Sequence, residues 1–183
     1  MLVSGYPIGS RKMKTKKEPL GGKCAVTGKE ETVAHVFARS PAARGLWQRV
    51  VKGWRKATGE DLRHTWITAA LLGHRSGQRA ELEEPFAILR AVVIRTLWRE
   101  RCAVRNGAAA RTTKELHDGV KEKLLDAADS RHAQVLSLAE ADDPSAREGA
   151  KGSMGEFRKA WVESGLLRTV QGTRTLNVTL RYT

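Results

Sequence analysis

Apolar residues recur at helical spacing in three long segments of this 183-residue chain, and this limits it to a mainly helical fold. Residues 41–58 carry one apolar stripe that includes Trp47 and Trp54. Residues 84–105 are apolar on nearly all sides, which is typical of a helix at the centre of a bundle. Residues 112–140 carry a narrower stripe that suits an antiparallel partner. We therefore predict a bundle of three to four helices.

The ends of these helices are marked by capping residues. Ser40 is a good N-cap, and Pro41 follows at the first helical position, where its missing N–H costs nothing. Gly59 can end the first helix in a left-handed conformation. Thr112 and Glu115 have the spacing of a capping box. These signals predict where the first and third helices begin and where the first one ends.

Changes in composition divide the chain into four parts. Residues 1–22 are rich in lysine and end in glycines, which predicts a basic, flexible arm. Residues 23–140 hold a small loop followed by the helical bundle. Residues 141–152 have the composition of a linker, and residues 153–183 follow as a small C-terminal unit. Within the bundle, residues 61–83 fit either a short helix or a loop.

The C-terminal unit is predicted to contain a short helix and a hairpin. Ser153 and Glu156 have capping-box spacing, and Gly165 closes the helix that follows. Residues 166–170 and 176–180 are two short apolar segments separated by a turn sequence, which predicts a small β-hairpin.

The charge of the chain points to a polyanionic partner. Lysine and arginine total 33 against 20 acidic residues, a formal net charge of +13. The first 60 residues hold 13 basic and only four acidic side chains. Such a charge favours nucleic acid first and acidic membrane surfaces second, although it also serves solubility. The N-terminal third is therefore expected to meet the partner.

Basic residues in two places are the candidate phosphate contacts. Those of the arm fit a phosphate-contacting or nuclear-import tail, but also a solvated leader. Those on 41–58 lie opposite the apolar stripe, where they either follow phosphates or form the solvated side of the helix. The candidates are Arg11, Lys12, Lys14, Lys16, Lys17, Lys23, Arg49, Lys52, Arg55 and Lys56.

Several classes of protein are excluded or disfavoured. The longest apolar runs are about five residues, too short for a membrane span, and residues 1–15 carry no secretory signal. Two cysteines cannot build a disulfide scaffold, so we expect an intracellular protein. Paired ionisable groups with catalytic spacing are missing, and Cys102 fits a packed thiol, so we do not expect an enzyme.

The segment from Cys24 to Ser40 has the shape of an incomplete zinc knuckle. Structural zinc sites use four ligands, usually thiolates and imidazoles. Cys24 and His35 are the two such ligands here, and thiols at Thr27 and Ser40 would complete a C-x2-C-x7-H-x4-C pattern. Because two ligands hold zinc poorly, we expect zinc binding to be weak or absent. We expect Val33, Val36, Phe37 and Trp47 to hold this knuckle together by packing.

The region around this knuckle resembles the zinc-binding region at the C-terminal end of non-LTR retrotransposon reverse transcriptases. The matching residues are Glu31-Thr32, His35, Pro41, Ala43 and Leu46-Trp47, with a fair likeness at Leu97-Trp98-Arg99. Thr27 and Ser40 depart from the family pattern, which has cysteines at these positions. The likeness is specific over 23–56 and loose beyond 106.

The resemblance implies a non-catalytic fragment that contacts RNA or DNA beside a polymerase, with a degenerate CCHC knuckle. With the basic arm, it implies a nuclear protein. The alternative is a retroelement-derived helical module that binds proteins, or a remnant that only folds; which protein partners it would have is unknown.

Overall fold

The computed structural model describes residues 22–60, 79–170 and 177–180, and most of these are helical. The helices are α1 (Pro41–Thr58), α3 (Glu83–Arg105), α4 (Thr113–Ala139) and α5 (Pro144–Phe157). Two short strands, β1 (Leu167–Val170) and β2 (Asn177–Leu180), form an antiparallel hairpin near the C-terminus. The prediction of a mainly helical fold is confirmed. The predicted hairpin is also present, with each strand one residue shorter than expected.

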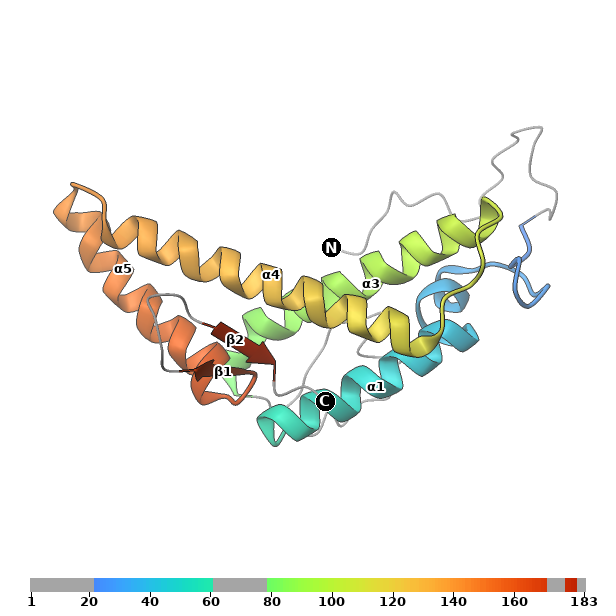
Figure 1. The fold of residues 1–183 in the computed structure, drawn as a ribbon, viewed down its shortest axis with the longest axis horizontal. Helices are drawn as coiled ribbons and strands as arrows, with labels where there is room; N and C mark the ends of the chain where they lie inside the picture. Colours follow the sequence, from blue (N-terminus) through green and yellow to red (C-terminus); the bar gives the residue numbers. More distant parts are fainter. Residues whose placement is uncertain (1–21, 61–78, 171–176, 181–183) are drawn as a thin grey trace.

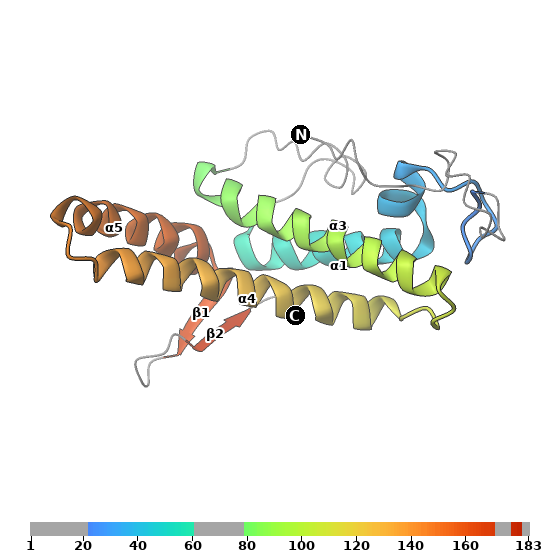
Figure 2. The same ribbon diagram turned by 90° about the horizontal axis from the view of Figure 1, so that it is seen from above.

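The helix α3 contacts both α1 and α4, and α4 also contacts α1 and α5. Figure 1 shows α4 running back beside α3 and extending beyond it, with α5 folded against that extension. Figure 2 shows the same pairing from above. The partly buried apolar side chains on the flanks of α3, Ile88, Val92, Ile94 and Trp98, pack against the core. The prediction of a central position for this helix was wrong, because Ala87, Ala91, Arg95 and Arg99 form an exposed face and only one side is fully buried.

Aromatic side chains fill the core and join its parts. Trp54 of α1 meets Phe86 of α3 edge to face, with ring centroids 5.5 Å apart. The Trp47 indole Nε1–H donates to the Phe37 carbonyl oxygen at 2.9 Å. This buried hydrogen bond fixes α1 to the π-helical turn His35–Arg39 that precedes it.

The helix boundaries follow the predicted capping residues. The Ser40 hydroxyl oxygen accepts a hydrogen bond from the Ala43 N–H at 3.2 Å, and Gly59 ends α1 with φ of 74°. Thr112 and Glu115 form both hydrogen bonds of a capping box at the start of α4. Local chemistry was therefore enough to place these ends.

The prediction of a linker at 141–152 was wrong, because α5 begins at Pro144 and includes the rest of that range. The Asp143 carboxylate caps the helix by accepting from the Ser145 N–H at 2.9 Å. The predicted start at Ser153 was wrong for the same reason, since residues 153–156 lie inside α5. Packing of α5 against α4, with Ala150 and Phe157 buried, outweighs the low helix propensity of its glycines.

Two smaller predictions need correction, and others fall outside the described residues. Val36, Phe37 and Trp47 are buried, but Val33 is 47% exposed and does not hold the knuckle. Leu138, which lies within the segment 112–140 predicted to carry an apolar stripe, is also exposed. The arm 1–22 lies outside the described part except for Gly22, and so does most of the ambiguous segment 61–83.

Replacing Gly165 by alanine is expected to lower the free energy of unfolding by about 2 kcal/mol. Gly165 has φ of +86°, and a Cβ there would stand 2.3 Å from the Ala57 carbonyl oxygen, so the contact between α1 and the C-terminal unit must open. Chemical denaturation measures the change. Gly155→Ala is the control: it lies in open space within α5 and should raise stability by about 0.5–1 kcal/mol. Equal effects of both substitutions would contradict the packing described here.

Candidate nucleic-acid interface

A tight turn precedes α1 and carries the residues of the predicted knuckle. The Cys24 N–H donates to the Lys29 carbonyl, and the Gly28 N–H donates to the Cys24 carbonyl, both at 2.8 Å. Lys23 and Glu30 pair as an isolated antiparallel bridge. Gly28 has φ of +67°, which glycine adopts without strain. The chain therefore folds back on itself directly after Cys24.

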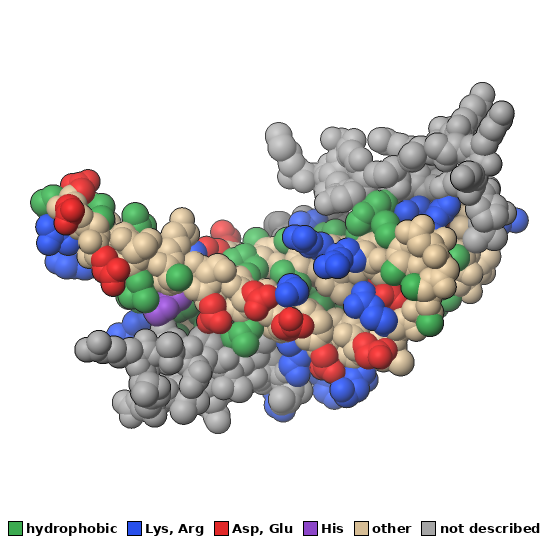
Figure 3. Space-filling model, turned by 45° about the horizontal axis from the view of Figure 1, so that its top comes forward, with side chains coloured by type: hydrophobic (Ala, Val, Ile, Leu, Met, Phe, Trp, Pro, Cys, Tyr) green, Lys and Arg blue, Asp and Glu red, His purple; other side chains and the backbone are tan. Residues whose placement is uncertain are grey.

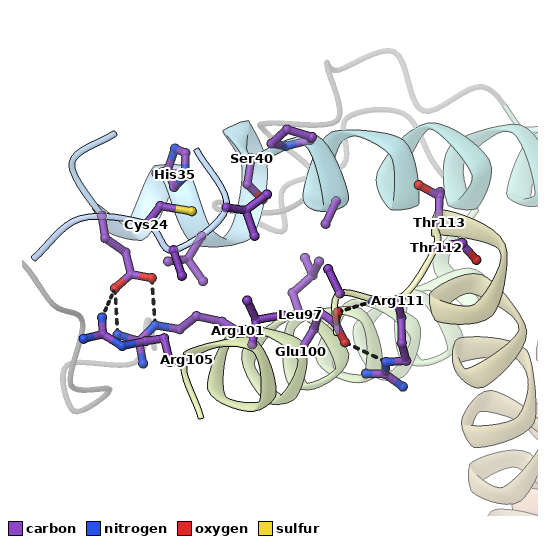
Figure 4. A pocket seen from close by; sticks show the side chains of 18 residues that line it. Cys24, His35, Ser40, Leu97, Glu100, Arg101, Arg105, Arg111, Thr112 and Thr113 are labelled. Carbon is purple, nitrogen blue, oxygen red and sulfur yellow. Dashed lines mark hydrogen bonds and ion pairs between the residues drawn. The ribbon is translucent and has the colours of Figure 1, made fainter. Parts of the chain in front are cut away.

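This turn brings the four knuckle positions to one end of the molecule. The Thr27 Oγ1 lies 3.3 Å from the His35 Nε2. Cys24, His35 and Ser40 line one cavity, and Figure 4 shows them close together at one end of it. Thr27 therefore contacts His35, while Cys24 and Ser40 share the cavity lining with that histidine.

The donor set does not fit a structural zinc ion. Cys24 and His35 supply one thiol and one imidazole, whereas such sites use four thiolate or imidazole ligands. Both hydroxyls already have protein partners: Thr27 contacts His35, and Ser40 caps α1. Among the described residues, no group of three or more His, Cys, Asp and Glu side chains is placed to hold a metal ion. Hydrogen bonds take the place of metal bonds in this turn.

A buried carboxylate anchors the turn to α3. Glu31 is 2% exposed and accepts hydrogen bonds from Arg101 Nε at 2.9 Å and Nη2 at 2.7 Å, and from Arg105 Nη1 at 2.7 Å. Burial raises the pKa of Glu31, but hydrogen bonds and charge from both guanidinium groups outweigh it, so the pKa lies below its usual range. Figure 4 shows both arginines reaching toward this carboxylate.

Sequence reasoning missed this ion-pair cluster. Glu31 was noted only within the family-like Glu31-Thr32 match, and neither Arg101 nor Arg105 was paired with it. About seventy residues separate the carboxylate from its arginines. A pairing over that distance leaves no periodic signal in the sequence.

A cavity of about 310 Å³ lies between the turn, the start of α1 and the last turns of α3. Its second carboxylate, Glu100, is also held by an arginine, accepting from the Arg111 backbone N–H at 2.7 Å and from Arg111 Nε at 2.6 Å. Both acids lining the cavity are thus neutralised by neighbouring arginines. The cavity is therefore part of the packed scaffold, and the most uniform exposed positive charge lies elsewhere.

That charge lies on the exposed face of α1. Between residues 44 and 56, six side chains are exposed, and Gln48 is the one that carries no charge. The other five are cations: Arg44, Arg49, Lys52, Arg55 and Lys56. The helix contains no acidic residue, and its opposite face is buried. We call these five cations the α1 basic face.

The exposed face of α4 differs from the α1 basic face because it carries both signs of charge. Figure 3 shows acidic and basic side chains interspersed along it. Lys114 bonds Asp118 at 2.8 Å, and Lys123 bonds Asp126 at 2.8 Å. Such pairs cancel at a distance, so α4 offers a polyanion little net attraction.

The positive potential of the α1 basic face reaches the seam with α4. There His117 is buried, and its pKa is lowered by that burial and then by the charge of Lys121. Arg49 of α1 lowers it further, while Asp118 acts in the opposite direction. The neutral form of His117 is therefore favoured mainly by its burial, with a smaller contribution from these cations.

Only some of the predicted phosphate contacts lie within the described residues. Arg49, Lys52, Arg55 and Lys56 come together on one helix face, and Lys23 is exposed in the turn. Arg11, Lys12, Lys14, Lys16 and Lys17 lie outside the described residues. The structure adds exposed Arg39, directly before Ser40, and Arg44, which was noted on the basic side of the helix but not chosen as a contact.

Comparisons with known proteins identify no relative of this chain. No family model, curated protein or solved structure matches the chain. Among the described helices, none is both long and apolar enough to cross a lipid bilayer.

Proposed function

We propose that this protein is a non-catalytic nucleic-acid-binding module that contacts the phosphate backbone through the α1 basic face. The observation that carries the proposal is the uniform sign of that face: five exposed cations, with no acidic residue in the helix. Lysine and arginine contacts to phosphates release condensed counterions and supply sequence-independent affinity.

The rigidity of α1 supports the proposal. Ser40 and Gly59 cap the helix, and Trp47 and Trp54 lock its other face into the core. The cations therefore stand in a fixed row, and little backbone entropy is lost on binding. The turn ahead of α1 adds Lys23 and Arg39 at the end of this row.

The approach of Cys24, Thr27, His35 and Ser40 supports a further part of the proposal. We propose that the chain derives from the zinc-binding region of a retrotransposon reverse transcriptase, with hydroxyls in place of two thiols. A nuclear location belongs to the same proposal and rests on the cations of residues 11–17.

Replacing Arg49 and Lys52 together by glutamine is expected to weaken nucleic-acid binding. Each lost phosphate contact lowers the slope of log affinity against log salt by about 1, so the double variant should lose about 2 from the slope. Fluorescence anisotropy with a labelled 20-base-pair duplex, titrated from about 50 to 200 mM salt, measures both affinity and slope.

The matched control is Lys123→Gln with Lys151→Gln. It removes the same charge from α4 and α5, where both lysines are exposed and paired with neighbouring acids. Wild-type affinity and slope are expected for this variant. A flat salt dependence of the wild-type chain, or equal losses in both double variants, would contradict binding through the α1 basic face.

A further inference from the structure

We infer that the α1 basic face takes the backbone of a duplex in preference to a single strand. This inference rests on the proposed nucleic-acid role and specifies its ligand. The evidence is the position of the aromatic rings: all those in the described residues are committed to the core or its edge. None is presented on α1 beside the cations.

Three tryptophans, Trp47, Trp54 and Trp161, are fully buried. Phe37, Phe86 and Phe157 are buried as well. Trp98 is half-buried, and its ring stacks on Phe37 while the Arg101 guanidinium lies 4.8 Å from its centroid. Tyr6, Trp66 and Tyr182 lie outside the described residues.

Proteins that hold single strands combine a basic groove with exposed rings on which successive bases stack. A surface that offers cations alone gains affinity from phosphates alone. A duplex presents about one negative charge per 1.7 Å of axis, and each phosphate contact releases more counterion from it than from a single strand. A duplex, which has the denser charge and keeps its bases inside, is therefore favoured over a single strand.

The length of the α1 basic face fits such a ligand. Arg44 and Lys56 are twelve residues apart on one continuous helix, a span of about 18 Å. This row exceeds the roughly 12 Å width of the major groove of B-form DNA. A preformed row of this length can contact phosphates on both sides of a groove without changing shape.

Four labelled probes of 20 nucleotides or base pairs test the inference with the full chain: duplex DNA, duplex RNA, and single-stranded dT and U. At about 100 mM salt, the duplexes are expected to bind at least about tenfold more tightly than the single strands. The two duplex arms show whether B-form or A-form backbone is preferred. The single strands should leave tryptophan fluorescence unquenched, because no ring among the described residues is exposed on α1 to stack on a base.

The outcomes separate this inference from the proposal on which it rests. Equal or tighter binding of a single strand, with quenching of tryptophan fluorescence, would overturn the duplex preference while leaving the nucleic-acid role intact. Binding of no probe at any salt concentration would overturn the proposed function itself. Loss of the duplex preference in the Arg49→Gln, Lys52→Gln variant, but not in the Lys123→Gln, Lys151→Gln control, would place the preference on α1.

Discussion

The variant that carries both Thr27→Cys and Ser40→Cys is expected to bind one zinc ion with a dissociation constant of about 10⁻⁷ M or below. Structural zinc sites with four thiolate or imidazole ligands supply about 10–16 kcal/mol at neutral pH. The turn already brings Thr27 within 3.3 Å of His35, and Cys24 and Ser40 line the same cavity as that histidine. Two new thiolates would complete the ligand set.

The substitution at Ser40 also carries a cost. It removes the hydrogen bond that caps α1, worth about 1 kcal/mol, which is small beside four metal bonds. Metal content after dialysis, with a thermal melt in the presence and absence of chelator, measures the gain. Adding Cys24→Ser to the double variant should abolish zinc binding. A folded double variant that retains no zinc would show that the four positions do not share a centre.

Glu31→Gln is expected to destabilise the protein by about 3 kcal/mol, because it leaves two arginines beside a site that no longer carries negative charge. Glu31 is buried, and the side chains of Arg101 and Arg105 are each only 14% exposed. Chemical denaturation measures the loss. Glu30→Gln is the matched control one residue away, on an exposed side chain, and should change stability by less than about 0.5 kcal/mol. Similar losses in both variants would count against the ion-pair cluster.

The contribution of Glu31 to stability should depend on pH in a defined direction. Its pKa is lower in the folded chain than in the unfolded chain, where glutamate titrates near about 4.3. The stabilisation is therefore fully present above about pH 5 and is lost as pH falls through the folded pKa. The difference in stability between the wild-type chain and Glu31→Gln should shrink from pH 6 to pH 3. A difference that stays constant over this range would mean that the carboxylate is not ionised in the folded chain.

The helices were predictable where local chemistry decides them. Ser40, Gly59, Thr112 and Glu115 act through hydrogen bonds or backbone conformations within a few residues, so the ends of α1 and the start of α4 could be predicted before any fold was known. The sequence-based prediction failed at α5 for the opposite reason. Its glycines and serines have low helix propensity, and the helix forms because Ala150 and Phe157 are buried, with α5 packed against α4.

The candidate site was also only partly predictable from the sequence. The sign of the α1 basic face follows from the sequence, since helical spacing places its cations opposite Trp47 and Trp54. Which basic segment stands out did not follow, because that required knowing that α4 pairs lysines with acids on its own exposed face, whereas the exposed charges of α1 all have one sign. The sequence also could not show that no described aromatic ring is exposed on α1, because this depends on how the rings pack into the core.

The sequence by itself determined the helical class, the capped ends of α1 and the capped start of α4, because each depends on interactions between near neighbours. Only the tertiary structure decided that Glu31 anchors the turn ahead of α1. Its arginines lie about seventy residues away on α3, and burial makes these ion pairs costly to break, because the remaining charge would be left without its partner. Contacts at such separation are set by packing, which no local pattern records.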